Sequence, residues 1–200
     1  IREEIIMPYL IAGLVLFFGA HLFSAFRSRA PGKDLRQRMG YGPYMGLYSL
    51  VALAGFGLII YGYDAARWMG SLYFAPSWGR HVNMTLMLPA MIILVAAYLP
   101  AGRIKKTLKH PMLVAVKLWA LGHLLANGEW NSVILFTSFL AYAIIDRIAV
   151  KKRGDTGPPA DVAPSNLGDI GALVIGIGVY LAFFFHLHEF LIGVPVLSGV

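Results

Sequence analysis

Long apolar runs recur along the whole chain, and this feature restricts its possible folds more than any other. The runs cover roughly residues 5–26, 44–63, 82–102, 111–128, 130–146 and 168–192. Each is close to the roughly 20 residues that an α-helix needs to cross the hydrocarbon core of a bilayer. Only 14% of the residues are charged, well below the usual share in soluble domains. The sequence therefore predicts an all-α, polytopic membrane protein, with six transmembrane helices in one bundle and a single domain over residues 1–200.

The basic residues predict how these helices are oriented. Of the 17 lysines and arginines, five lie between the first two runs, four between the third and fourth, and four between the fifth and sixth. These loops share one side of the membrane, which the positive-inside rule assigns to the cytoplasm. Both termini are then expected outside. Trp68, Trp78 and Trp130 all fall at the predicted outer interface, where indole rings prefer to lie. The positive charge is thus an orientation signal, and we expect no nucleic-acid binding.

The residue types exclude several kinds of active site. The chain has no cysteine, so disulfides, thiolate catalysis and iron–sulfur clusters are excluded. It contains no HExxH zinc motif, no GxSxG nucleophile elbow and no glycine-rich phosphate loop. Any chemistry must therefore use imidazole, the few carboxylates inside the spans, or a bound cofactor.

His123 is the most informative histidine. It lies within the fourth apolar run, where a polar ring is costly unless it has a partner or a function. Trp119, His123 and Asn127 are spaced four residues apart, so we expect them on one stripe of a helix. His123 is then either a residue that hydrogen-bonds across helices or an axial ligand to a haem iron.

His21 stands in the first run in the same way, and its alternative role is a hydrogen bond to a hydroxyl such as that of Ser24. Single histidines on separate helices suit haem b better than zinc. Zinc requires three or four protein ligands in tetrahedral array, whereas haem requires one or two imidazoles and an apolar slot. Glycines such as Gly55 and Gly57, or Gly176, would allow the close approach that such a slot needs.

Several stretches of the chain resemble the NnrU family of membrane proteins. They are FFGAHLFSAFR, WGRHVNMTLMLPAMIILVAAYLPAGRIKKTLKHPMLVAVKLWALGHLLANG, LAYAIIDRIAVKKR and HEFLIGVPV, so nearly the whole chain is covered. That family includes the 15-cis-zeta-carotene isomerases of plants and cyanobacteria. In these enzymes haem b, held by two histidines, isomerises a cis double bond without net redox change.

The resemblance implies that His21 and His123 are the two iron ligands. Because Trp119 and Asn127 share a helical stripe with His123, we expect them beside the cofactor. The plant enzyme has a cysteine three residues before the second histidine, proposed as an alternative ligand. Here that position is Ala120, so an exchange of histidine for cysteine is not available to this chain.

The depths of the histidines suggest alternatives to His21. Helical rise places His21 about 20 Å from the outer end of its run and His123 about 8 Å from its own. Because two ligands of one iron should lie nearly level, His81 and His188 are the outer-side histidines that could replace His21.

The bacterial branch of the family takes its name from a link to nitrite and nitric oxide reduction, which implies a multi-pass protein of the bacterial inner membrane. Three functions stay open. One is haem-dependent isomerisation of a polyene or carotenoid-like lipid, and another is a redox or nitric oxide-linked step in denitrification with a redox partner. The third is a non-enzymatic factor that assembles or regulates a reductase. If this last function is correct, replacing His123 should lower the stability of the fold. If His123 binds haem, replacing it should remove the haem absorption spectrum.

Overall fold

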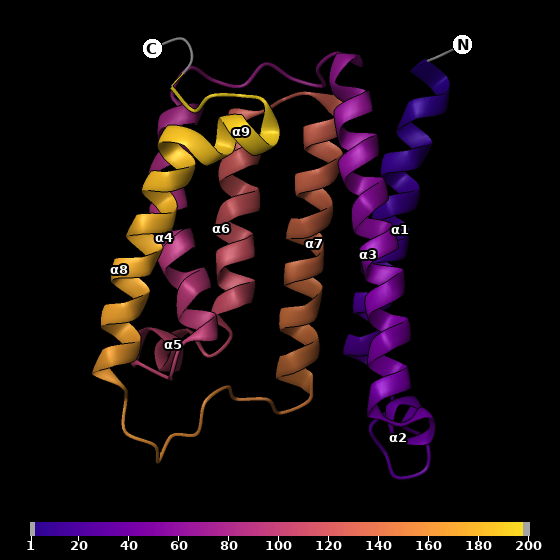
Figure 1. Cartoon of the computed structure of the whole chain (residues 1–200), viewed down its shortest axis with the longest axis vertical. Coiled ribbons are helices and arrows are strands. Elements are labelled where there is room, and N and C mark those ends of the chain that lie inside the picture. Colours follow the sequence, from indigo (N-terminus) through magenta and orange to yellow (C-terminus); the bar gives the residue numbers. More distant parts are fainter. Residues whose placement is uncertain (1–2, 198–200) are drawn as a thin grey trace. The chain divides into compact units, whose positions relative to one another are not determined.

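The computed structural model describes residues 3–197, which form helices and loops with one isolated bridge between Ser71 and Glu129. The all-α class is confirmed: no strand is present in this range. The helices fall into two compact units (Figure 1). Unit 1 comprises Ile1–Ala75 and Asn127–Arg153, and unit 2 comprises Pro76–Ala126 and Gly154–Val200. Each unit takes two separate stretches of the chain, and the single domain expected from the sequence stays a prediction.

Unit 1 is built on three long helices, α1 (Glu3–Phe26), α3 (Tyr41–Ala65) and α7 (Trp130–Lys152). The short helix α2 (Leu35–Met39) precedes α3, and the 3₁₀ turn η1 (Ala66–Trp68) follows it. Helix α1 packs against α3 and α7. Its contact with α3 is backbone to backbone, because a Cβ added to Gly55 would lie 2.6 Å from the amide nitrogen of Phe17. Small residues allow such close packing within a bilayer.

Unit 2 is centred on α4 (Gly79–Tyr98), which packs against α6 (Pro111–Ala126) and α8 (Asn166–Ala182). The short helix α5 (Arg103–Leu108) lies between α4 and α6 in the sequence. A π-helical turn, η2 (Phe183–Leu187), joins α8 to α9 (His188–Ile192). Gly176 lets α8 approach α4 closely, because a Cβ there would lie 2.6 Å from the Cα of Ile92. The glycines at Gly55 and Gly176 therefore serve contacts between helices.

Five segments within residues 3–197 are long and apolar enough to cross a membrane. They are Met7–Phe26, Tyr41–Trp68, Gly79–Tyr98, Trp130–Lys152 and Asn166–Ile192. They coincide with five of the six apolar runs, so a multi-pass membrane protein is confirmed. Helix α6 has 16 residues, which gives about 24 Å, somewhat less than a typical hydrocarbon core. The sixth span stays a prediction. So does the outward placement of the termini, because residues 1–2 and 198–200 lie outside the described range.

The three tryptophans expected at the outer interface are exposed at the ends of helices. Trp68 is the last residue of η1, Trp78 immediately precedes α4, and Trp130 is the first residue of α7. Their exposed fractions are 87%, 55% and 40%, respectively. Large exposed indole rings at helix ends are typical of interfacial anchors.

Candidate histidine ligand sites

His21 lies on α1 and lines a groove of about 300 Å³ in unit 1. Its imidazole packs on the ring of Phe17, with 4.2 Å between the ring centroids. The rings of Tyr48 and Tyr142 lie 5.3 and 5.7 Å from it. Besides His21, Phe17 and Tyr48, the groove is lined by Ser49, Ala52, Leu53 and Phe56, all from α3. His21 is therefore a polar ring at the wall of a largely aromatic and apolar groove. Its partner is the carbonyl of Phe17 and not the hydroxyl of Ser24.

One kind of hydrogen bond fixes the tautomer of three histidines in their neutral form. In each of them, Nδ1 lies 2.6–2.8 Å from a backbone carbonyl oxygen. The pairs are His21 with Phe17, His123 with Trp119, and His188 with Val194. Because a carbonyl oxygen only accepts, each Nδ1 carries the proton, and Nε2 of the neutral ring carries the lone pair. Metal-ligating histidines usually show this arrangement, in which a carbonyl holds the other N–H and orients the ring.

His123 lies on α6 beside a close contact with α4. A Cβ added to its neighbour Gly122 would lie 2.5 Å from Oδ1 of Asn83 and 3.1 Å from Cε of Met87. Oδ1 of Asn83 is buried and finds no hydrogen-bond partner among the described residues. The indole of Trp119 lies 5.4 Å from the imidazole of His123, centroid to centroid. The ring therefore has an aromatic neighbour on its own helix, and the adjacent helix contact contains an unsatisfied polar atom.

Asn127 lies one residue beyond the end of α6, which is Ala126. Trp119 and His123 lie on α6, which belongs to unit 2, whereas Asn127 belongs to unit 1. Its carbonyl oxygen accepts a hydrogen bond from the hydroxyl of Tyr73 at 2.8 Å. Burial raises the pKa of the Tyr73 phenol, so this hydroxyl stays protonated and donates at neutral pH. Asn127 is thus a loop residue whose backbone joins two connections within unit 1.

The π-helical turn η2 separates two further histidines. A π turn holds one residue more than an α-helical turn and is frequent at functional sites. His186 lies within the turn and is exposed, and His188 begins α9 and is half-buried. His188 interacts electrostatically with His123, so unit 2 brings these two histidines near one another. Figure 1 shows α9 turning away from the axis of α8 at this point.

The other two histidines lie in more polar surroundings. His81 is exposed near the start of α4, as expected for an interfacial residue. Nε2 of His110 lies 3.1 Å from the carbonyl oxygen of Asp155 and 3.7 Å from its carboxylate. His110 therefore serves to hold the loop that precedes α8.

The described histidines do not form a conventional metal cluster. Within residues 3–197, no three His, Cys, Asp or Glu side chains come together as a group that could hold a metal ion. His21 belongs to unit 1, whereas His123, His81 and His188 belong to unit 2. The sequence did not single out Tyr48 and Tyr142, which lie beside His21, or Asn83, which lies beside Gly122. Each of them is nevertheless visible in the sequence as a polar residue inside an apolar run.

Compared with known protein families, the chain matches the family described as NnrU protein over residues 9–196. No curated protein matches the chain significantly, and no solved structure does. The family match covers nearly all of the chain, including all four of the histidines considered as ligands. The chain therefore belongs to the NnrU family.

Proposed function

We propose that this chain is a haem b-binding integral membrane protein and that His123 is one axial ligand of the iron. The observation that carries the proposal is the hydrogen bond from Nδ1 of His123 to the carbonyl oxygen of Trp119, at 2.8 Å. It leaves the lone pair on Nε2, which is the form of imidazole that coordinates a metal. The adjacent indole of Trp119 supplies an apolar, planar surface beside that ring.

The donor set of the chain fits haem better than a bare metal ion. Residues 3–197 offer no group of three or more metal-ligating side chains. A porphyrin supplies four nitrogen ligands itself and requires from the protein only axial ligands and an apolar environment. When bound, haem supplies an iron centre that can bind nitric oxide, transfer an electron or act on the double bond of a polyene.

Three histidines are candidates for a second axial ligand. The resemblance to the carotene isomerases favours His21, whose Nδ1 is bonded to a carbonyl and whose ring lines an apolar groove. Location favours His188, which shares a unit with His123, interacts with it electrostatically and has its own Nδ1 bonded to a carbonyl. His81 is the weakest candidate because it is exposed.

The residues around His123 restrict which chemistry the bound group performs. Ala120 is fully buried on the same helix and offers no thiolate, so this position would not supply a bound haem with a cysteine ligand in exchange for histidine. As an isomerase, the protein would draw an apolar polyene from the bilayer. A nitric oxide-linked role in denitrification would instead require a redox partner.

Absorption spectra of the detergent-purified protein, oxidised and dithionite-reduced, test the proposal. We expect a Soret band with sharp reduced α and β bands when the protein comes from haem-replete cells. His123→Ala should lose most of this absorbance, and so should whichever of His21→Ala and His188→Ala removes the second ligand. His110→Ala is the matched control, because the ring of His110 is held by Asp155 at 3.1 Å.

A colourless protein from haem-replete cells would overturn the proposal. The non-enzymatic role in reductase assembly or regulation would then be favoured. In that case His123→Ala should cost only stability, by about 1 kcal/mol, which is the usual size of a polar side-chain interaction within a membrane protein.

A further inference from the structure

Arg27 is a buried cation whose hydrogen-bonding capacity is incompletely used. It follows α1 directly, and its side chain is 8% exposed. Its Nε and Nη1 groups are buried and find no acceptor among the described residues. Oδ1 of Asp34 lies 3.7 Å from Nε, which is an ion-pair distance but too long for a hydrogen bond. The guanidinium lies over the ring of Tyr44, 5.8 Å from its centroid, and the Tyr44 hydroxyl is also buried without a partner.

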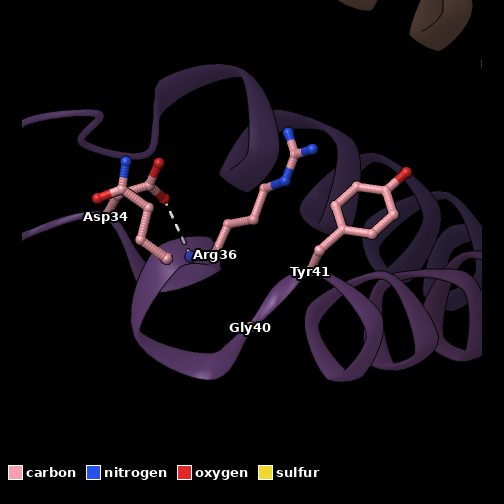
Figure 2. A pocket seen from close by; sticks show the side chains of 5 residues that line it. Asp34, Arg36, Gly40 and Tyr41 are labelled. Atoms are coloured by element: carbon pink, nitrogen blue, oxygen red, sulfur yellow. Dashed lines mark hydrogen bonds between the residues drawn. The ribbon is translucent and has the colours of Figure 1, made fainter.

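The carboxylate of Asp34 is already engaged elsewhere. Figure 2 shows it accepting a hydrogen bond from the backbone nitrogen of Arg36, at 3.0 Å. This bond caps the N-terminus of α2. The same carboxylate lines a pocket of about 370 Å³ with Gly40 and Tyr41. Asp34 therefore neutralises part of the charge of Arg27 and satisfies none of its unpaired N–H groups.

Two more arginines add positive charge to this region of unit 1. Arg29 interacts electrostatically with two residues of the same charge, Arg27 and Arg153, and with the carboxylate of Asp34. Arg29 is exposed, and partial desolvation together with the two neighbouring positive charges lowers the pKa of its guanidinium, which still stays charged. Nη1 of Arg153 donates to the carbonyl of Ala25 at 2.8 Å, as expected for an arginine that caps a helix C-terminus. Helix capping thus accounts for Arg153 but not for the unpaired donors of Arg27.

We propose that Arg27, Arg29, Arg153 and Tyr44 form a binding site for a phosphate-type oxyanion. A buried cation with unpaired donors is unfavourable, and phosphate oxygens accept charge-assisted hydrogen bonds from arginine. The site lies where α1 and α7 end, on the side that the positive-inside rule assigns to the cytoplasm. Anionic lipids are abundant in that leaflet, and basic pockets at the ends of membrane helices bind their head groups. The location favours an anionic phospholipid over free phosphate as the source of the oxyanion.

Thermal unfolding of the full chain in detergent, after exchange to remove endogenous lipid, tests this site. Mixed micelles with phosphatidylglycerol should raise the Tm saturably, and those with phosphatidylcholine should not. Arg27→Gln should weaken the apparent affinity for phosphatidylglycerol by about tenfold or more. Arg38→Gln removes the same charge from an exposed position on α2 and should leave that affinity nearly unchanged.

A second variant keeps the test decisive if Arg27→Gln fails to fold. Tyr44→Phe changes no charge and removes one buried hydroxyl. It should weaken the response to phosphatidylglycerol roughly threefold if that hydroxyl contacts the oxyanion. An unchanged response in Tyr44→Phe, with Arg27→Gln either equally responsive or unfolded, would overturn the site.

Inorganic phosphate, compared with chloride at equal ionic strength, distinguishes the sources of the oxyanion. A saturable response to phosphate that Arg27→Gln or Tyr44→Phe weakens would assign a free anion. A response to phosphatidylglycerol alone, weakened by the same variants, would assign the lipid head group.

Discussion

Two glycines of α3 have opposite surroundings although they are only two residues apart. A Cβ on Gly55 would lie 2.6 Å from the backbone nitrogen of Phe17, whereas a Cβ on Gly57 would meet no atom within 4 Å. Backbone atoms of α1 cannot move aside as a flexible side chain can. We therefore expect Gly55→Ala to destabilise the protein by about 1–3 kcal/mol, as overpacking does elsewhere.

Gly57→Ala is the control for that prediction, because it makes the same chemical change on the same helix. We expect it to be neutral, or to stabilise by up to about 1 kcal/mol through better helix propensity. Thermal unfolding in detergent measures both variants. Equal melting temperatures would show that α1 and α3 do not approach one another as closely as Gly55 indicates.

At the scale of single residues, the sequence predicts the candidate ligands better than their surroundings. His21 and His123 are recognisable because each is an imidazole inside an apolar run. Their bonds to carbonyls four residues earlier also follow from helical spacing. The unpaired donors of Arg27 are different. They depend on how the loop that contains Asp34 packs at the ends of α1 and α7. The spacing of residues in the sequence does not predict that arrangement.

Among the elements, α5 depends on a residue of another helix for its N-terminal cap. Its own cap position is Gly102, which has no side chain. The carboxylate of Asp169 on α8 accepts hydrogen bonds from the backbone nitrogens of Arg103 and Ile104, at 2.7 and 3.1 Å. Removing an acidic cap of this kind typically costs about 1–2 kcal/mol. We expect Asp169→Ala to lower stability by that amount and to free the first turn of α5.

Hydrogen exchange of residues 103–108 measures this effect directly. Asp161→Ala serves as the control, because Asp161 lies exposed in the loop before α8. Faster exchange in α5 should appear in Asp169→Ala alone. Unaltered exchange there would mean that α5 is held by its packing and not by its cap.

Hydrophobic runs predict long helices well, because burial in lipid leaves the backbone no other way to satisfy its polar groups. Five of the expected runs correspond to long helices of the structure. Short elements are less visible in the sequence. Helix α5 depends on the distant Asp169, and the π turn η2 differs from its α-helical flanks by a local change of register. Neither feature has an apolar period of its own.

For the whole molecule, the contacts of unit 2 bear on whether α6 crosses the membrane. Nζ of Lys106, on α5, donates to the carbonyl oxygens of Ala160 and Val162, so the segment before α6 lies beside the loop after α7. Helix α7 is long and apolar enough to cross a membrane. If α7 crosses, these two segments can share one side only if α6 crosses as well. The division of the helices into two units was not predictable, because it joins stretches that are far apart in the chain.

The absence of native cysteine makes this topology directly testable. Single cysteines replace three exposed residues, Ser77, Thr107 and Asp161. In spheroplasts we expect a membrane-impermeant maleimide to label Ser77→Cys, and to label Thr107→Cys and Asp161→Cys only after permeabilisation. Labelling of Thr107→Cys and Asp161→Cys from opposite sides would show that α6 does not cross. Labelling of both from outside would reverse the predicted orientation.

The π-helical turn at Phe183–Leu187 affects how homologous chains should be compared. Its extra residue rotates everything that follows by about 100° around the helix axis. A homologue with one residue deleted from this segment could keep a histidine in the same alignment column as His188 and still direct it to another side of the bundle. Insertions and deletions within these five residues, more than the identity of the aligned letter, therefore indicate which homologues can present this imidazole in the same direction.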